Sequence, residues 1–205
     1  VIKKFIESKN ENELIDKLFK REVENYQKVD FPLHPKFYGK IKGKNSFVIQ
    51  FINGQTLKDI KNIELNDEDK IFIILELILI VEYFYNNHFI YRDLKPNNVI
   101  IDENKIIYAF DFDRMINIDN IDSDNENHTT DIGTEFAAPE LNSGQISYKN
   151  DIYSLGKMIS YITKDTVEKE INLFFQKIIT KCIDNCAGNR PYISEIKKNF
   201  FLLIL

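Results

Sequence analysis

The stretch from Ile90 to Ile100 places an acid, a base and an amide within six residues, at Asp93, Lys95 and Asn98. Pro96 rules out a continuous helix there, and apolar residues flank the stretch on both sides. Such a sequence is typical of a charged loop between buried elements, where many proteins carry catalytic residues. The three side chains suit phosphoryl transfer, which needs a carboxylate for the attacking hydroxyl, a cation for the phosphoryl group and an oxygen ligand for magnesium.

Residues 91–98 read YRDLKPNN, which resembles the catalytic loop of eukaryotic protein kinases, H/Y-R-D-L-K-x-x-N, in its serine/threonine form. The resemblance implies that Asp93 orients the substrate hydroxyl, Lys95 neutralises developing charge and Asn98 holds metal. It also implies ATP and Mg²⁺ as cofactors and a protein as substrate. A polar surface turn is the structural alternative.

The same resemblance implies a two-lobed α+β fold over residues 1–205. A partial, β-rich N-lobe would take residues 1–50, a hinge 51–57, and a mainly helical C-lobe 58–205. Kinases place a glycine-rich hairpin before the lysine strand, and no G-x-G-x-x-G precedes that strand here. We expect weak nucleotide binding if the chain is whole, and an upstream hairpin if it is a fragment.

The nucleotide side begins at the first strand, where residues 1–3 match V/A-I-K and Lys3 would hold the α- and β-phosphates. Apolar spacing predicts a helix from Glu11 to Val29, and Glu22 on it resembles the glutamate that pairs with the lysine. The alternatives are a solvated strand end for Lys3 and an i,i+4 surface pair for Glu22.

Residues 48–57, VIQFINGQTL, resemble the hinge between kinase lobes. By that resemblance Ile49 is the gatekeeper, and the backbone at Gln50 and Ile52 meets the adenine edge. Ile100 would form the floor under the adenine ring.

A second metal ligand is implied by Asp111-Phe112-Asp113, which resembles D-F-G after an apolar strand at 106–110. Asp111 would chelate magnesium. Asp113 stands where the family has glycine, whose freedom at positive φ lets the segment change conformation. Asp113 would stiffen the switch or place a second carboxylate near the metals, and the sequence leaves both open.

The polar loop at 114–133 resembles the kinase activation segment. Arg92 would bind a phosphate placed on Thr129 or Thr130. Its carboxylates could instead imitate a phosphate, or form an ordinary solvated loop. These acids are Asp119, Asp122, Asp124, Glu126 and Asp131.

Residues 133–140, GTEFAAPE, resemble G-T-x-x-Y/F-x-A-P-E. The resemblance makes Thr134 a catalytic-site residue that hydrogen-bonds near Asp93 and Lys95. It also pairs Glu140 with Arg190, fifty residues on.

The run DIYSLG at 151–156 resembles D-x-W/Y-S-x-G. Asp151 is expected to cap the helix that follows and to accept hydrogen bonds from the backbone of Tyr91 and Arg92. Further elements are predicted from periodicity and turn residues. They are strands at 37–41 and 46–52, a helix capped by Asp67 and ending near Asn86, a hairpin turning at 103–104, and helices at 167–182 and 193–203.

Composition sets the class of protein. With 205 residues, 43% hydrophobic residues and a net charge of −5, we expect a globular protein that binds neither nucleic acid nor membrane. The apolar run 71–85 is too short to span a bilayer and is broken by Glu76 and Glu82. Cys182 and Cys186 are expected to be reduced, in an intracellular, cytoplasmic protein.

Three functions compete. The first is a serine/threonine protein kinase. The second is a pseudokinase scaffold or allosteric module, which the absent glycine-rich loop and Asp113 favour. The third is a small-molecule phosphotransferase related to the aminoglycoside kinases, which Asp-Phe-Asp suggests, although those enzymes lack the Ala-Pro-Glu and Asp-x-Tyr-Ser-Leu-Gly elements seen here.

Overall fold

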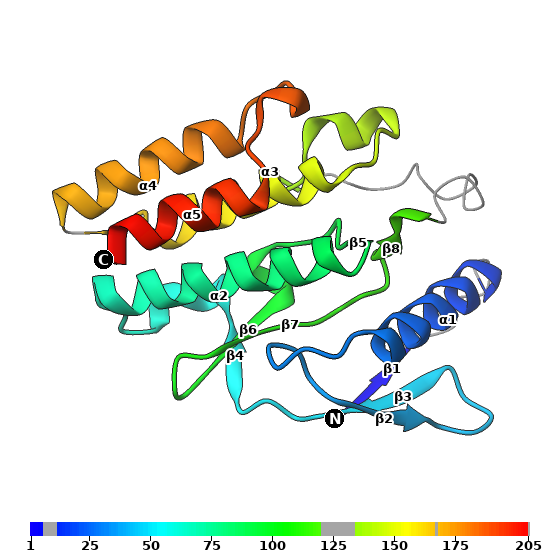
Figure 1. Ribbon diagram of the computed structural model, residues 1–205. Helices are drawn as coiled ribbons and strands as arrows, with labels where there is room; N and C mark the ends of the chain where they lie inside the picture. The colour runs from blue at the N-terminus through cyan, green and yellow to red at the C-terminus, as the bar shows by residue number, and fades with distance from the viewer. Residues whose placement is uncertain (6–11, 120–133, 167, 205) are drawn as a thin grey trace.

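The computed structural model describes residues 1–5, 12–119, 134–166 and 168–204, and it consists of two parts (Figure 1). A small part, made of a three-stranded sheet and helix α1, lies beside a larger, mainly helical part. The predicted two-lobed α+β architecture is therefore confirmed. The helices are α1 (Asn12–Lys28), α2 (Asp67–Asn86), α3 (Tyr148–Ile162), α4 (Lys169–Cys182) and α5 (Ile193–Ile204). The strands are β1 (Ile2–Lys4), β2 (Phe37–Lys40), β3 (Ser46–Ile49), β4 (Gly54–Thr56), β5 (Phe89–Ile90), β6 (Val99–Asp102), β7 (Ile107–Ala109) and β8 (Ile116–Asn117). Short 3-10 helices cover Leu57–Asn62, Pro96–Asn98, Pro139–Ser143 and Ala187–Asn189.

The small sheet has the antiparallel order β1-β3-β2, with Lys3 opposite Phe47. Helix α1 packs on it because its apolar residues recur at helical spacing, which buries Phe19, Val23 and Tyr26. The ring of Tyr26 lies 5.4 Å from that of Phe47, centroid to centroid. This packing fixes the face of α1 that carries Glu22.

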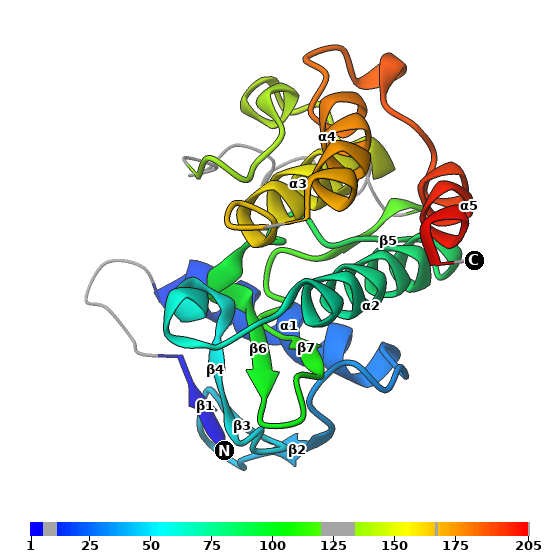
Figure 2. The same ribbon diagram turned by 90° about the vertical axis from the view of Figure 1, so that its left-hand side faces the viewer.

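Helix α2 runs through the centre of the larger part (Figure 2). It is buried along much of its length. The N-cap of α2 is Asn66. Asp67, which was predicted to be the cap, is the first residue of the helix. Asn66 has the extended backbone that a cap needs, and its side chain accepts a hydrogen bond from the backbone of Asp69. No helix in the described chain is long and apolar enough to cross a membrane.

The larger part also contains two small sheets that the sequence did not predict in full. Strand β4 pairs with β6, and β6 with β7; β5 pairs with β8. A Cβ atom on Gly54 would lie 2.1 Å from the carbonyl oxygen of Ile101, so only glycine fits this close approach between β4 and β6. The hairpin turn at 103–104 is confirmed.

Helix α3 is capped by Ser147, whose side chain accepts from Lys149 N in a capping box with Asn150. The prediction that Asp151 caps this helix is wrong, because Asp151 lies inside the first turn. Helices α4 and α5 follow close to the predicted bounds. Cys182 and Cys186 are both free, the first buried and the second exposed.

Candidate active site

The catalytic-loop candidates converge on the carboxylate of Asp93. Lys95 Nζ lies 2.8 Å from each Asp93 oxygen, and Asn98 Nδ2 donates to Asp93 Oδ2 at 2.7 Å. A second bond from Asn98 Nδ2 reaches the backbone oxygen of Asp93 at 3.0 Å, which closes the loop on itself. The acid, base and amide singled out by spacing are thus in direct contact.

Buried Asp151 supports this loop from helix α3. Its two oxygens accept from the backbone nitrogens of Tyr91 and Arg92, at 2.7 and 2.8 Å, as predicted. Arg92 has φ 68°, a left-handed conformation that is costly for a residue with a side chain. Burial raises the pKa of Asp151 to about 6, against the lowering effect of the two backbone hydrogen bonds. The strained backbone persists because α3 holds it.

A second group forms around Lys3, which bridges the two parts of the molecule. Its Nζ lies 2.8 Å from Glu22 Oε1 and 2.6 Å from Asp111 Oδ1. Burial by itself would lower the pKa of Lys3. The charges of Glu22 and Asp111 together outweigh burial, so the pKa of Lys3 is raised above its usual value. The ammonium group therefore stays charged between two carboxylates.

Glu22 is fully buried, and its environment is unusual for a carboxylate. Oε1 also accepts from Phe112 N at 3.2 Å, while Oε2 has no hydrogen-bond partner among the described residues. Burial raises the pKa of Glu22 to about 7 against the ion pair with Lys3. The ion pair implied by resemblance is present, and the alternative of a surface i,i+4 pair is excluded.

Asp111 and its neighbours adjoin the catalytic loop, since Phe110 N donates to Asn98 O at 3.0 Å. Asp111 itself has φ 68°. Burial, and then the charge of Asp111, raise the pKa of Asp113 to about 6; Asp113 Oδ1 is buried without a partner in the described structure. The replacement of glycine thus puts a further carboxylate against the site.

Asn98 and Asp111 have the chemistry to hold a divalent cation. Asn98 uses only its amide nitrogen for hydrogen bonds, and Asp111 uses only Oδ1, so Asn98 Oδ1 and Asp111 Oδ2 are free of hydrogen bonds within the described residues. Oxygen ligands of these two kinds suit Mg²⁺. The described chain contains no group of three or more His, Cys, Asp or Glu placed to hold a metal, so water or phosphate would supply the other ligands.

The residues predicted to contact adenine lie where the two parts join. Ile49 ends β3 and is buried, and Ile100 lies in β6 opposite Tyr108. Gln50 N donates to Lys36 O at 2.8 Å. The Gln50 carbonyl and the Ile52 NH make no hydrogen bond within the described chain, which leaves both for a ligand. Their role in binding adenine stays a prediction.

The Glu140–Arg190 pair is present as predicted and is bidentate. Arg190 Nη1 lies 2.6 Å from Glu140 Oε1, and Nη2 lies 2.8 Å from Oε2. Burial by itself would raise the pKa of Glu140. The hydrogen bonds from Arg190 outweigh burial, so the pKa of Glu140 is lowered below its usual value. Asn150 Nδ2 adds a third bond to Glu140 at 2.7 Å.

The hydrogen bond predicted between Thr134 and the catalytic loop is not seen among the described residues. Thr134 is exposed, and its side chain makes no hydrogen bond to any described residue. Three residues separate Thr134 from Ala138, whereas the pattern G-T-x-x-Y/F-x-A-P-E has four between its Thr and Ala. The match is therefore one residue short, and the hydrogen bond predicted for Thr134 stays without support.

Arg92 is almost buried, with 9% of its surface exposed, and its Nε has no partner among the described residues. Burial, and then the charges of Arg21 and Arg114, lower the pKa of Arg92. Such a site favours an anion, but the predicted phosphate acceptors Thr129 and Thr130 lie outside the described residues. So do Asp122, Asp124, Glu126 and Asp131.

Two asparagines that complete the site were not predicted. Asn25 Nδ2 donates to the carbonyls of Phe112 and Met115, at 2.7 and 2.8 Å, and so holds the chain after Asp111. It lies three residues after Glu22 on the same helix face, a spacing that could have identified it. Asn150 accepts a hydrogen bond from Ser147 N in the capping box of α3 and also donates to Glu140, and no local pattern signals the second contact.

Comparison with known proteins agrees with this geometry. A sequence model described as protein kinase domain matches residues 1–170. A probable serine/threonine-protein kinase of Dictyostelium discoideum is 32% identical over 156 residues, which are 75% of this chain and 11% of that protein. Serine/threonine-protein kinase D of Synechocystis is 30% identical over 202 residues (93% and 37%), and the Arabidopsis thaliana kinase OXI1 is 32% identical over 128 (58% and 30%). The chain thus spans between 11 and 37% of the lengths of these relatives.

Proposed function

The chain belongs to the protein kinase family, and from that premise we propose that it transfers the γ-phosphoryl group of ATP to serine or threonine hydroxyls of a protein substrate. One observation carries the proposal: Lys3 is held between Glu22 and Asp111, next to a catalytic loop in which Asp93 contacts both Lys95 and Asn98. The serine/threonine relatives and the lysine of the loop support the choice of hydroxyl.

Each side chain has a task in this mechanism. Asp93 accepts the hydrogen bond of the attacking hydroxyl and takes its proton as the new P–O bond forms and the bond from the γ-phosphorus to the bridging oxygen breaks, which releases ADP. Lys95, already 2.8 Å from Asp93, neutralises charge on the transferred group. Lys3 holds the α- and β-phosphates, and Glu22 keeps Lys3 pointed at them.

Mg²⁺, held by Asn98 and Asp111, would offset the charge of the β- and γ-phosphates. The backbone of Gln50 and Ile52 would bind the adenine edge, with Ile49 as the gatekeeper and Ile100 as the floor under the ring.

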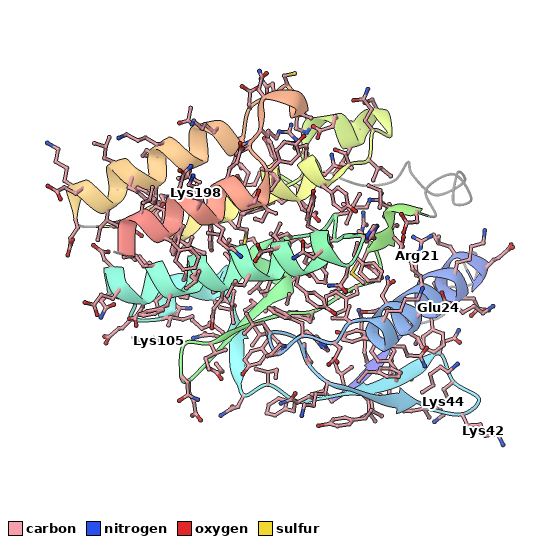
Figure 3. All side chains as sticks on the ribbon, viewed as in Figure 1. Arg21, Glu24, Lys42, Lys44, Lys105 and Lys198 are labelled. Atoms are coloured by element: carbon pink, nitrogen blue, oxygen red, sulfur yellow. The ribbon has the colours of Figure 1, made fainter. Side chains whose placement is uncertain are left out.

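The test is phosphorylation of a generic serine/threonine protein substrate with labelled ATP and Mg²⁺. We expect Asp93→Asn to lower the rate by about 100- to 10,000-fold, as for loss of a general base, and Lys3→Met to lower it comparably. Lys42→Met, in the turn between β2 and β3 and far from the site, is the matched control (Figure 3). A wild-type rate in Asp93→Asn would overturn the assignment.

A second candidate is a non-catalytic member of the family that binds nucleotide. Asp113 favours it, because a buried carboxylate without a partner replaces the expected glycine. This candidate predicts that Mg·ATP raises the melting temperature while no phosphate is transferred. It also predicts that Asp113→Gly restores transfer, whereas the first candidate predicts transfer by the wild type.

A further inference from the structure

A groove runs between helices α4 and α5, on the part of the chain that follows residues 1–170. The two helices lie side by side and run in opposite directions (Figure 1). The groove has a volume of about 570 Å³, within the range of about 300–1,000 Å³ that ligand sites occupy. It lies away from the Lys3 and Asp93 groups, and none of its lining residues takes part in the proposed catalysis.

The groove has a firm apolar base. Beneath it the rings of Phe175 and Phe200 are fully buried, with centroids 6.2 Å apart. Phe174, Ile178 and Ile196 line it, and Leu202 at its edge is 68% exposed. A large apolar side chain left in water beside a cavity is a feature of binding surfaces.

Three lysines surround this apolar base. Lys177 and Lys181 come from α4, and Lys198 from α5, at the position labelled in Figure 3. None of them has an ion-pair or hydrogen-bond partner among the described residues. By contrast their neighbour Lys197 lies 2.6 Å from Glu82.

Two of these lysines repel each other, although Lys181 also lies in the last turn of α4, where a cation is favourable. Lys177 and Lys181 are four apart on one helix, a like-charge spacing that destabilises a helix slightly. Glu195, the one acid lining the groove, already has its carboxylate bound to Tyr192 N at 3.0 Å. The groove is therefore positive within a chain of net charge −5.

We propose that this groove docks an acidic, amphipathic helical segment of a partner protein. Leucine-like side chains on one face of that segment would enter the groove, and carboxylates beside them would pair with the three lysines. A concave site between two helices fits a peptide better than a membrane surface, which favours apolar groups that project. The proposal is independent of phosphoryl transfer.

The experiment measures binding of fluorescent helical peptides to the whole chain by anisotropy. One peptide carries Leu at i, i+3, i+4 and i+7 with Glu between them; a second has Lys for Glu, and a third Ser for Leu. Only the first should bind, and its affinity should fall as salt rises from about 0.05 to 0.5 M. K177E/K181E/K198E should weaken it by at least about tenfold, and Leu202→Ser should also weaken it.

Two controls separate this site from the others. Lys42→Glu/Lys44→Glu reverses charge in the β2–β3 turn and should leave peptide affinity unchanged. Asp93→Asn should do the same, so that failure of the proposed catalysis would not affect this result.

Equal binding by wild type and K177E/K181E/K198E, or no binding of the acidic peptide, overturns the proposal. Lysine-dependent binding of phosphatidylserine vesicles without peptide binding also overturns it, in favour of a membrane surface. Light scattering would show whether the chain self-associates through this groove. Self-association that prevents peptide binding overturns the proposal, because a second copy of the chain would then be the occupant of the groove.

Discussion

Removing Arg190 should destabilise the whole domain, because its guanidinium is buried and all three of its nitrogens donate hydrogen bonds. Besides its two bonds to Glu140, Nε donates to Asp184 O at 2.8 Å and Nη1 to Lys149 O at 2.9 Å. Arg190→Met would leave the Glu140 carboxylate with only the Asn150 amide and would remove the side-chain donor of the Asp184 carbonyl. Breaking a buried pair in this way costs about 3–5 kcal/mol. For a chain of this size the melting temperature should fall by roughly 6–20 °C.

Arg190→Lys keeps the charge but loses the bidentate geometry, so it should have an intermediate effect. The assay is urea unfolding followed by fluorescence and circular dichroism, with Glu140→Gln and the double variant completing a cycle. The pKa of Glu140 is lowered in the folded state, so its contribution is present above its unfolded pKa and is lost as pH falls through the folded pKa. That acid-dependent loss should shrink in Arg190→Met.

The reasoning fails if Arg190→Met costs less than about 1 kcal/mol. It also fails if the two single changes add without coupling, since contacting residues should show an interaction energy of at least about 0.5 kcal/mol.

Two other predictions concern single sites. Gly54→Ala should lower the free energy of unfolding by about 1–3 kcal/mol in the same urea assay, because its Cβ would meet the Ile101 carbonyl at 2.1 Å. The control is Gly188→Ala, whose Cβ would meet nothing closer than 3.8 Å. Equal effects of the two changes would contradict the argument. Burial raises the pKa of Glu76 to about 7 despite the hydrogen bond from Ile107 N, so its favourable contribution is complete below the unfolded pKa near 4.5 and is lost as pH rises through about 7. Glu76→Gln should therefore gain stability relative to the wild type between about pH 5 and 8, and parallel stability curves for the two proteins would refute the shift.

Residue spacing predicted the parts of the site whose chemistry is local. Asp93, Lys95 and Asn98 are close in the chain, and their contacts follow from one turn. The Glu140–Arg190 pair spans fifty residues, and it was predicted from resemblance to a family pattern rather than from spacing. The extent of α1 followed from apolar periodicity, because a buried helix face repeats over many residues. The extent of α2 was predicted from a capping residue and a long apolar run instead.

The missed features depend on contacts that carry no local signal. Strands β5 and β8 are two residues each, too short for an alternating pattern, and they exist only because they pair with each other. Asn66 and Asp67 are both acceptable caps by residue type, and backbone conformation decides between them. The role predicted for Thr134 stays a prediction, because the chain has one residue fewer than the family pattern between Thr134 and Ala138.

The hydrogen bonds from Tyr91 and Arg92 to Asp151 span 60 and 59 residues, and this has a consequence for how the protein is made. During synthesis the ribosome completes the loop that carries Asp93, Lys95 and Asn98 well before it reaches the Asp151 carboxylate, which holds the backbone of that loop. A nascent chain ending before α3 would carry Asp93, Lys95 and Asn98 in sequence but without a fixed geometry. The geometry of the Asp93 loop should thus be fixed only when α3 docks.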